Sequence, residues 1–198
     1  MRDTERVPRI DAPTVAEHHV MRRTAIVAAA RDLLGTSGVA AVTPAAVAAE
    51  SGLARTSVYQ YFPSTDALVA AAVEATFANS ADLLADVVAQ AGGPRERIEA
   101  YVREALRIAA RDHNPFHQLT LADLPPGCVA RVRVLHDELV APLRSAVEDL
   151  GVPDAALVTG LIFGAISSAV QLVDHGPDLA RTTAGTLAFV DAGLAAAG

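Results

Sequence analysis

Six polar or aromatic side chains lie close together in a short segment that contains no acidic residue. They are Arg55, Thr56, Ser57, Tyr59, Gln60 and Tyr61. Arg and Gln can hydrogen-bond to purine edges in a major groove, and Ser, Thr and Tyr hydroxyls can donate to phosphate oxygens. The alternative is that the two tyrosines only pack on neighbouring helices. The surrounding pattern favours a surface that binds a polyanion.

Two short helices around a glycine turn are expected to position these side chains. Thr43 is a good N-cap, and Pro44 occupies the first helical position, where its missing N–H costs nothing. Gly52 supplies the permissive backbone that a tight turn requires. Apolar residues recur on one face of each helix. The stretch from Val42 to Phe62 is therefore predicted to be a helix-turn-helix.

A helix on each side completes the predicted head. The first runs from Met21 to Gly38, because its apolar residues follow helical spacing and glycine is a common helix stop. Pro63 ends the recognition helix, and a long helix with an N-cap at Ser64 or Thr65 follows it. The helix-turn-helix domain is thus expected at residues 21–66, and a helical body at residues 67–198.

Residues 1–20 mix charges, prolines and histidines without a clear period. We expect either a mobile arm or a short appended helix. Because Met21 directly precedes a strong helical pattern, a native chain that starts there is an alternative. Sequencing the N-terminus of the native protein would distinguish these cases.

The remaining residues predict an all-α body, since no strand pattern is present. Helices are expected to end near Gly92 and near Asn114, with one short helix in the broken segment 116–124. Three longer helices should cover 129–150, 153–175 and 177–197, the first of them bent or interrupted by Pro142. The whole chain is therefore expected to contain about nine helices.

The segment AALVTGLIFGAISSAVQLV, between Asp154 and Asp174, is 19 residues long and uncharged. This length could span a bilayer, but polar residues inside the segment and Asp at both ends disfavour insertion. A soluble helix that is apolar all round is buried on all sides. Gly160, Gly164 and Ala165 would let another helix approach closely, so a subunit interface is expected here.

The net charge of −7 is unevenly distributed. Residues 1–62 carry seven Arg and six acidic residues, whereas residues 63–198 carry nine Arg and 17 acidic residues. An acidic body is compatible with a DNA-binding head, because the attraction to phosphates is local and is screened beyond roughly 10 Å. A single cysteine, Cys128, excludes an intramolecular disulfide, and no N-terminal segment resembles a secretion signal. A cytoplasmic protein is expected.

The chain resembles the TetR family of bacterial transcriptional regulators over residues 22–68. The first helix ends in a glycine, a threonine and a Val-Ala pair follow, and a turn glycine precedes Val-Tyr-x-Tyr-Phe and an Asp-x-Leu. These positions are Gly38, Thr43, Val47, Ala48, Gly52, Val58, Tyr59, Gln60, Tyr61, Phe62, Asp66 and Leu68. Beyond residue 80 the likeness is one of architecture.

The resemblance implies roles for the exposed residues of the head. Those expected to face base edges are Arg55, Thr56 and Gln60, and those expected to hold the DNA backbone are Thr43, Ser57, Tyr59 and Tyr61. Two positions depart from the family pattern. Ala54 stands where a capping Ser is frequent, and Thr65 stands where a Lys often reaches a phosphate. Arg22 and Arg23 are candidates to compensate for that lost cation.

The resemblance also implies that residues 67–198 are a ligand-binding and dimerisation domain, whose last two long helices form a homodimer. Such a dimer binds palindromic double-stranded DNA, and a small molecule entering the body releases it. The expected protein is thus a repressor of transcription. An activator or ligand-independent regulator with the same head is one alternative. An all-helical enzyme or ligand carrier with a vestigial head is another, although no catalytic constellation is visible and no enzyme is predicted.

An effector site in the body would be mostly apolar with a few polar groups. The candidates are Phe77, Tyr101, Phe116, His117, Thr120, Leu121, Phe163, Ser167 and Gln171. Core packing is the simpler role for each of them. His113 and His117 have the spacing of metal ligands on a helix, but Pro115 lies between them and no third ligand is near. We therefore predict no metal and no cofactor.

Overall fold

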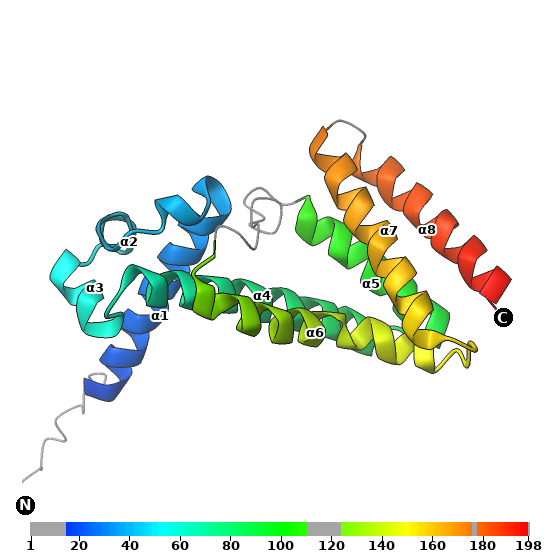
Figure 1. Ribbon diagram of the computed structural model, residues 1–198, viewed down its shortest axis with the longest axis horizontal. Coiled ribbons are helices and arrows are strands. Elements are labelled where there is room, and N and C mark those ends of the chain that lie inside the picture. Colours follow the sequence, from blue (N-terminus) through cyan, green and yellow to red (C-terminus); the bar gives the residue numbers. More distant parts are fainter. Residues whose placement is uncertain (1–14, 111–123, 176–177, 198) are drawn as a thin grey trace, which may run out of the picture.

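The computed structural model describes residues 15–110, 124–175 and 178–197 (Figure 1). These residues form eight α-helices and one short 3₁₀ helix, with no strand among them. The elements are α1 (Val15–Ser37), η1 (Val39–Ala41), α2 (Pro44–Ser51), α3 (Arg55–Tyr61), α4 (Thr65–Gln90), α5 (Pro94–Ala109), α6 (Pro126–Glu148), α7 (Ala155–His175) and α8 (Leu179–Ala197). The all-α prediction is confirmed. The additional short helix expected at 116–124 falls almost entirely outside the described residues.

Several helix boundaries differ from the sequence prediction. Helix α1 begins at Val15 instead of Met21, so residues 15–20 belong to it, and residues 1–14 of the expected arm lie outside the described part. Helix α6 begins three residues before the predicted start and continues through Pro142. A proline removes one backbone donor, and in α6 this loss does not end the helix.

The head has a core built by α1, α2, α3 and the first half of α4, to which Leu124 and the first turns of α6, through Cys128 and Leu135, also contribute. Its largest fully buried side chains are aliphatic and include Ile26, Leu34, Val47, Val58 and Leu68. Four of them lie on the first three helices, and each belongs to the apolar face that the sequence shows for its helix. The head helices therefore hold α3 from one side and leave its other side at the surface (Figure 1).

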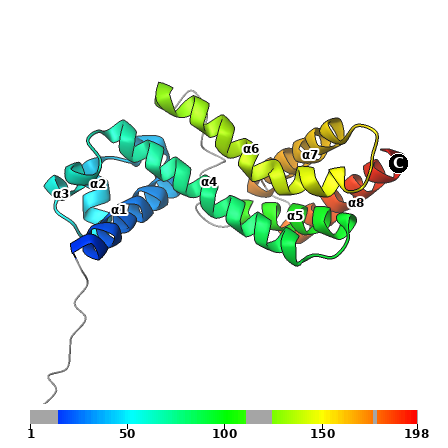
Figure 2. The ribbon, with the colours of Figure 1, turned by 90° about the horizontal axis from the view of Figure 1, so that it is seen from below.

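The body has a second core, to which α4, α5, α6, α7 and α8 contribute. Tyr101 on α5 is 1% exposed, and its hydroxyl donates to the Leu139 carbonyl of α6 at 3.2 Å. Burial raises the pKa of Tyr101 well above its ordinary value. Helix α4 runs from the head into the body, as both views show (Figures 1 and 2). Helix α4 is thus a single continuous helix with residues in both cores.

Two helices among the described residues are long and apolar enough to cross a membrane by length and composition. The most apolar window of α4 is 44% buried, which fits a core helix of a folded domain. The corresponding window of α7 is only 22% buried. The sequence predicted a helix buried on all sides, but within one chain α7 leaves Leu157, Leu161 and Leu172 more than half exposed.

Candidate nucleic-acid interface

The turn between α2 and α3 has the geometry expected from the sequence. Thr43 caps α2, its Oγ1 accepting the backbone N–H of Ala46 at 3.2 Å. Gly52 adopts a left-handed conformation with φ of 68°, which favours glycine over residues with a Cβ. Leu53 and Ala54 then lead directly into α3 at Arg55. The chain therefore reverses within three residues between two helices, as in a helix-turn-helix.

Helix α3 presents most of its polar residues to solvent. Arg55, Thr56, Tyr59 and Gln60 are exposed, whereas Ser57 and Tyr61 are partly buried. Val58, on the opposite face, is fully buried in the head core. The exposed face of this helix carries no acidic side chain. It is therefore free of the groups that would repel a phosphate backbone.

Arg55 and Tyr59 interact along the exposed face of α3. An Arg55 terminal nitrogen lies 3.5 Å from the Tyr59 hydroxyl, and the guanidinium carbon lies 5.8 Å from the ring centroid. Residues four apart meet on one helical face, and a cation over an aromatic face is weakly attracted to it. The two side chains therefore restrict one another before any ligand is present.

The end of α3 packs against α1. His19 lies 4.6 Å from Tyr61 between ring centroids, and the Arg23 guanidinium carbon lies 5.3 Å from the Phe62 ring centroid. The sequence indicated Arg23 as a candidate for DNA binding but did not indicate His19. His19 and Arg23 are four residues apart and share a face only if both are helical. The sequence predicted that this helix begins at Met21, after His19.

The two departures from the family pattern have local consequences. Ala54 is the N-cap of α3 and provides no side-chain hydrogen bond, as predicted. Thr65 is the first residue of α4 and is exposed, while Ser64 caps that helix by accepting the Ala67 N–H at 3.1 Å. Arg22 and Arg23 are exposed on α1. The head thus retains exposed cations although position 65 has none.

The candidate effector residues are dispersed over the body and the base of the head. Phe77 is buried in the head core, and Tyr101 is buried in the body core. Phe163 is half-buried and meets the His136 ring edge-on at 4.8 Å. Ser167 and Gln171 lie on the exposed side of α7. Phe116, His117, Thr120 and Leu121 lie outside the described residues.

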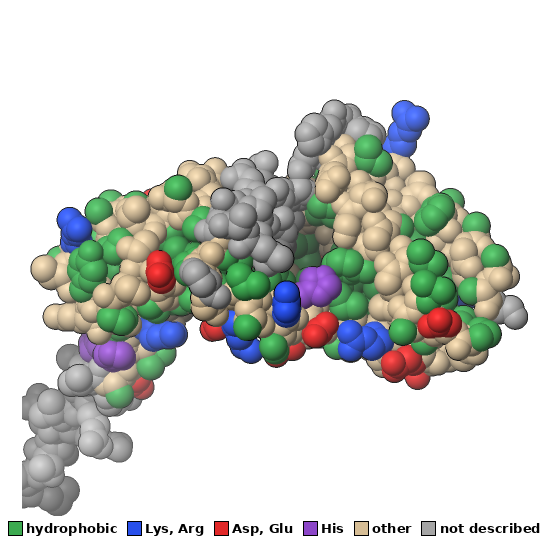
Figure 3. Space-filling view, in the orientation of Figure 1, with side chains coloured by type: hydrophobic (Ala, Val, Ile, Leu, Met, Phe, Trp, Pro, Cys, Tyr) green, Lys and Arg blue, Asp and Glu red, His purple; other side chains and the backbone are tan. Residues whose placement is uncertain are grey.

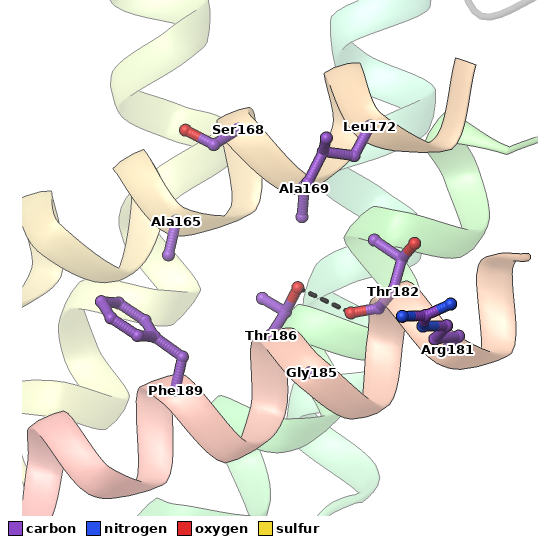
Figure 4. A pocket seen from close by; sticks show the side chains of 9 residues that line it. All are labelled: Ala165, Ser168, Ala169, Leu172, Arg181, Thr182, Gly185, Thr186 and Phe189. Carbon is purple, nitrogen blue, oxygen red and sulfur yellow. Dashed lines mark hydrogen bonds between the residues drawn. The ribbon is translucent and has the colours of Figure 1, made fainter. Parts of the chain in front are cut away.

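Two adjoining grooves follow α7 and α8, with volumes of about 570 and 520 Å³. Ala165 and Ala169 point from α7 toward α8 in the first of them, and Thr186 on α8 donates to the Thr182 carbonyl at 2.8 Å (Figure 4). Gly160 and Gly164 line the second. Gly160, Gly164 and Ala165 are the small residues that the sequence indicated for close helix approach.

A third hollow of about 290 Å³ lies between α4 and the first turns of α6. Arg131 on α6 pairs there with Glu74 on α4, their atoms 3.2 Å apart. Cys128 lines the same hollow and is 7% exposed, and burial together with Asp66 and Glu74 raises the pKa of its thiol. No cluster of three or more potential metal ligands occurs in the described part of the chain; His113 and His117 lie outside it.

Taken together, the head has the geometry of helix-turn-helix transcriptional regulators. Residues 26–72 match the family model described as bacterial regulatory proteins of the tetR family. The HTH-type transcriptional regulator BetI of Rhizobium meliloti is 31% identical over 87 residues, which cover 44% of this chain and 43% of that protein. This chain therefore spans less than half the length of that curated relative.

Similar solved structures extend the likeness to the body. A TetR-family transcriptional regulator from Streptomyces coelicolor superposes with a TM-score of 0.78 at 13% identity, covering 94% of this chain and 97% of that one. FadR from Bacillus subtilis, in complex with stearoyl-CoA, gives 0.71 at 17% identity, covering 84% and 96%. These similarities show a shared fold. Residues 26–72 are therefore similar to bacterial regulatory proteins of the tetR family, and the chain shares the fold of solved TetR-family regulators.

Proposed function

We propose that this protein is a dimeric repressor that binds a palindromic operator and is released from it by a small, mostly apolar effector. The observation that carries the proposal is the exposed face of α3, which presents Arg55, Thr56, Tyr59 and Gln60 without any carboxylate. A helix of this kind fits a major groove, where Arg and Gln distinguish purines.

The roles are those that the resemblance to the TetR family implies. Arg55, Thr56 and Gln60, all exposed on α3, contact base edges. Ser57, Tyr59 and Tyr61 contact the DNA backbone through their hydroxyls, and Thr43 adds a contact from the start of α2. The Thr43 oxygen accepts a helix N–H, so its hydroxyl proton stays available for a phosphate.

A second copy of the chain is proposed to cover α7 and α8. Four large apolar side chains of these helices are strongly exposed: Leu157 at 58%, Leu161 at 62%, Leu172 at 55% and Phe189 at 68%. Much of the surface over these helices is uncharged (Figure 3). A contiguous apolar face of this kind marks an interaction site. Two-fold pairing would place two α3 helices in successive major grooves.

Helix α4 offers a mechanical route from effector to DNA. Its first half packs in the head core through Leu68 and Val73, and its second half packs in the body core through Leu84 and Val88. A ligand that binds the body more tightly when the heads are splayed shifts the population toward that state. The stearoyl-CoA complex of the similarly folded FadR supports an apolar effector. The candidate contacts remain those predicted from the sequence, of which Phe77, Tyr101, Phe163, Ser167 and Gln171 lie on the described helices.

The cell compartment follows from this function. A regulator that binds chromosomal DNA acts in the cytoplasm and needs no membrane. The apolar windows of α4 and α7 are then explained by the core and by the proposed subunit interface.

The experiment is a duplex-binding titration with the intact protein and the DNA upstream of its own coding region. We expect tight, sequence-preferring binding whose affinity falls steeply with salt. Binding that is absent, or equal for a scrambled duplex, would contradict the proposal. Transcript levels in a deletion strain then separate repressor from activator, because loss of a repressor raises transcription of its targets.

A further inference from the structure

The N-terminal part of α1 reaches the C-terminal end of α3. His19 and Arg23 are four residues apart and therefore lie on one face of α1. His19 contacts Tyr61 with 4.6 Å between ring centroids and an angle of 40° between the ring planes. Arg23 lies over Phe62 at 5.3 Å. Helix α1 thus covers the two consecutive aromatic residues at the end of α3.

The two contacts act on side chains in different situations. Phe62 is 4% exposed and is held by the head core, so Arg23 covers a ring that is already fixed. Tyr61 is only half-buried, with one side against the core and the rest toward the surface. His19 is itself exposed, and it packs on this incompletely held ring. The contact from His19 is therefore the one that restricts a side chain otherwise able to move.

We propose that His19 is a positioning residue for DNA binding, which holds the Tyr61 ring so that its hydroxyl donates to a backbone phosphate. This inference rests on the proposed function, in which Tyr61 contacts the DNA backbone. Packing between two rings restricts their rotation. A ring that is fixed before binding loses less conformational entropy when its hydroxyl meets the phosphate. Because every nucleotide carries a phosphate, His19 affects all sequences alike.

The first test compares single variants on two probes, the duplex upstream of the coding region and a random-sequence duplex of equal length. His19→Ala should weaken binding to both probes about fivefold per protomer, the worth of one hydrogen bond. His19→Phe should restore wild-type affinity, because phenylalanine can pack on Tyr61. His18→Ala is the matched control, since His18 lies on another face of α1, and it should leave affinity unchanged.

The second test is a double-mutant cycle with Tyr61→Phe, which removes the hydroxyl and keeps the ring. If His19 acts through that hydroxyl, His19→Ala causes no additional loss in the Tyr61→Phe protein. The salt dependence of His19→Ala should equal that of the wild type, because no charge contact to phosphate is lost. Thermal unfolding of each variant verifies the fold, and His19→Gln provides a second side chain that cannot pack as a ring.

Three results would overturn the proposal: a loss that persists in the Tyr61→Phe background, a failure of His19→Phe to restore affinity, or a salt slope reduced by one charge. These results are distinct from failure of the proposed function. In that case the wild-type protein itself shows no salt-sensitive binding to either probe.

Discussion

At the residue scale, the side chains of α3 divide into those that read sequence and those that hold the backbone. Arg55→Ala or Gln60→Ala should reduce discrimination between operator and scrambled DNA by about 1–3 kcal/mol, because a bidentate contact to a base is lost. Tyr59→Phe should instead weaken both duplexes alike, by about 1 kcal/mol. Titrations of both duplexes at one salt concentration measure the difference. If Arg55→Ala and Gln60→Ala weakened the operator and the scrambled duplex equally, as Tyr59→Phe should, the assigned roles would be contradicted.

The buried Tyr101 should make the folded protein less stable at alkaline pH. Its folded-state pKa lies above the unfolded value of about 10, so the unfolded chain releases this proton first. The free energy of unfolding should therefore fall by up to about 1.4 kcal/mol per pH unit as the pH rises above about 10. The chain contains no lysine, so no ammonium group titrates in this pH range beside the tyrosines. Cys128, whose pKa is also raised, acts in the same direction from about pH 8.5.

Urea unfolding between pH 8 and pH 11.5 measures this effect. Tyr101→Phe should be less stable at neutral pH by about 1 kcal/mol, because the hydrogen bond to the Leu139 carbonyl is lost. Above about pH 10, however, its stability should decline less steeply than that of the wild type. Parallel declines would show that Tyr101 is not the responsible group. Cys128→Ala, measured beside it, separates the contribution of the thiol.

At the element scale, α3 is the helix with the weakest start. Ala54 occupies its N-cap without a side-chain hydrogen bond, whereas Thr43 and Ser64 cap the helices on either side. Ala54→Ser should raise the free energy of unfolding by about 1 kcal/mol, and the melting temperature by about 2–4 °C. Ala45→Ser, on the exposed side of α2, is a control that supplies a hydroxyl without a capping position. A decrease in melting temperature for Ala54→Ser would refute this assignment.

The elements that the sequence predicted well are those with local signals. Thr43, Gly52 and Ser64 set the ends of α2 and the start of α4 through hydrogen bonds and backbone conformations that span only a few residues. The start of α1 had no such signal. Residues 15–20 show no apolar period, and His19 meets Tyr61, which is distant in sequence. Contacts of this range depend on the folded head and could not be deduced from spacing along the chain.

At the scale of the whole molecule, α7 and α8 carry outward apolar side chains that the rest of the chain does not cover. The sequence indicated their apolar residues and glycines, but it could not show which sides remain open after the body core forms. Ile162 and Ile166 face that core, whereas Leu161 and Phe189 face solvent. One apolar helix pair thus supplies two separate surfaces. The outward one is the surface that a second copy is proposed to cover.

Phe189→Asp tests this assembly and its link to DNA binding. The side chain is 68% exposed and lines both grooves, so the change should leave the fold of one chain intact while placing an unpaired charge in the proposed interface. Dimer dissociation, measured by sedimentation, should become at least about thirtyfold more favourable. Val134→Asp, an exposed apolar residue on α6, is the matched control and should remain dimeric.

Because each protomer would bring one α3 to the operator, the monomeric variant should lose most operator affinity while still binding an isolated half-site weakly. A Phe189→Asp protein that stays dimeric would reject α7 and α8 as the interface. A monomeric variant that keeps full operator affinity would reject the dependence of DNA binding on pairing.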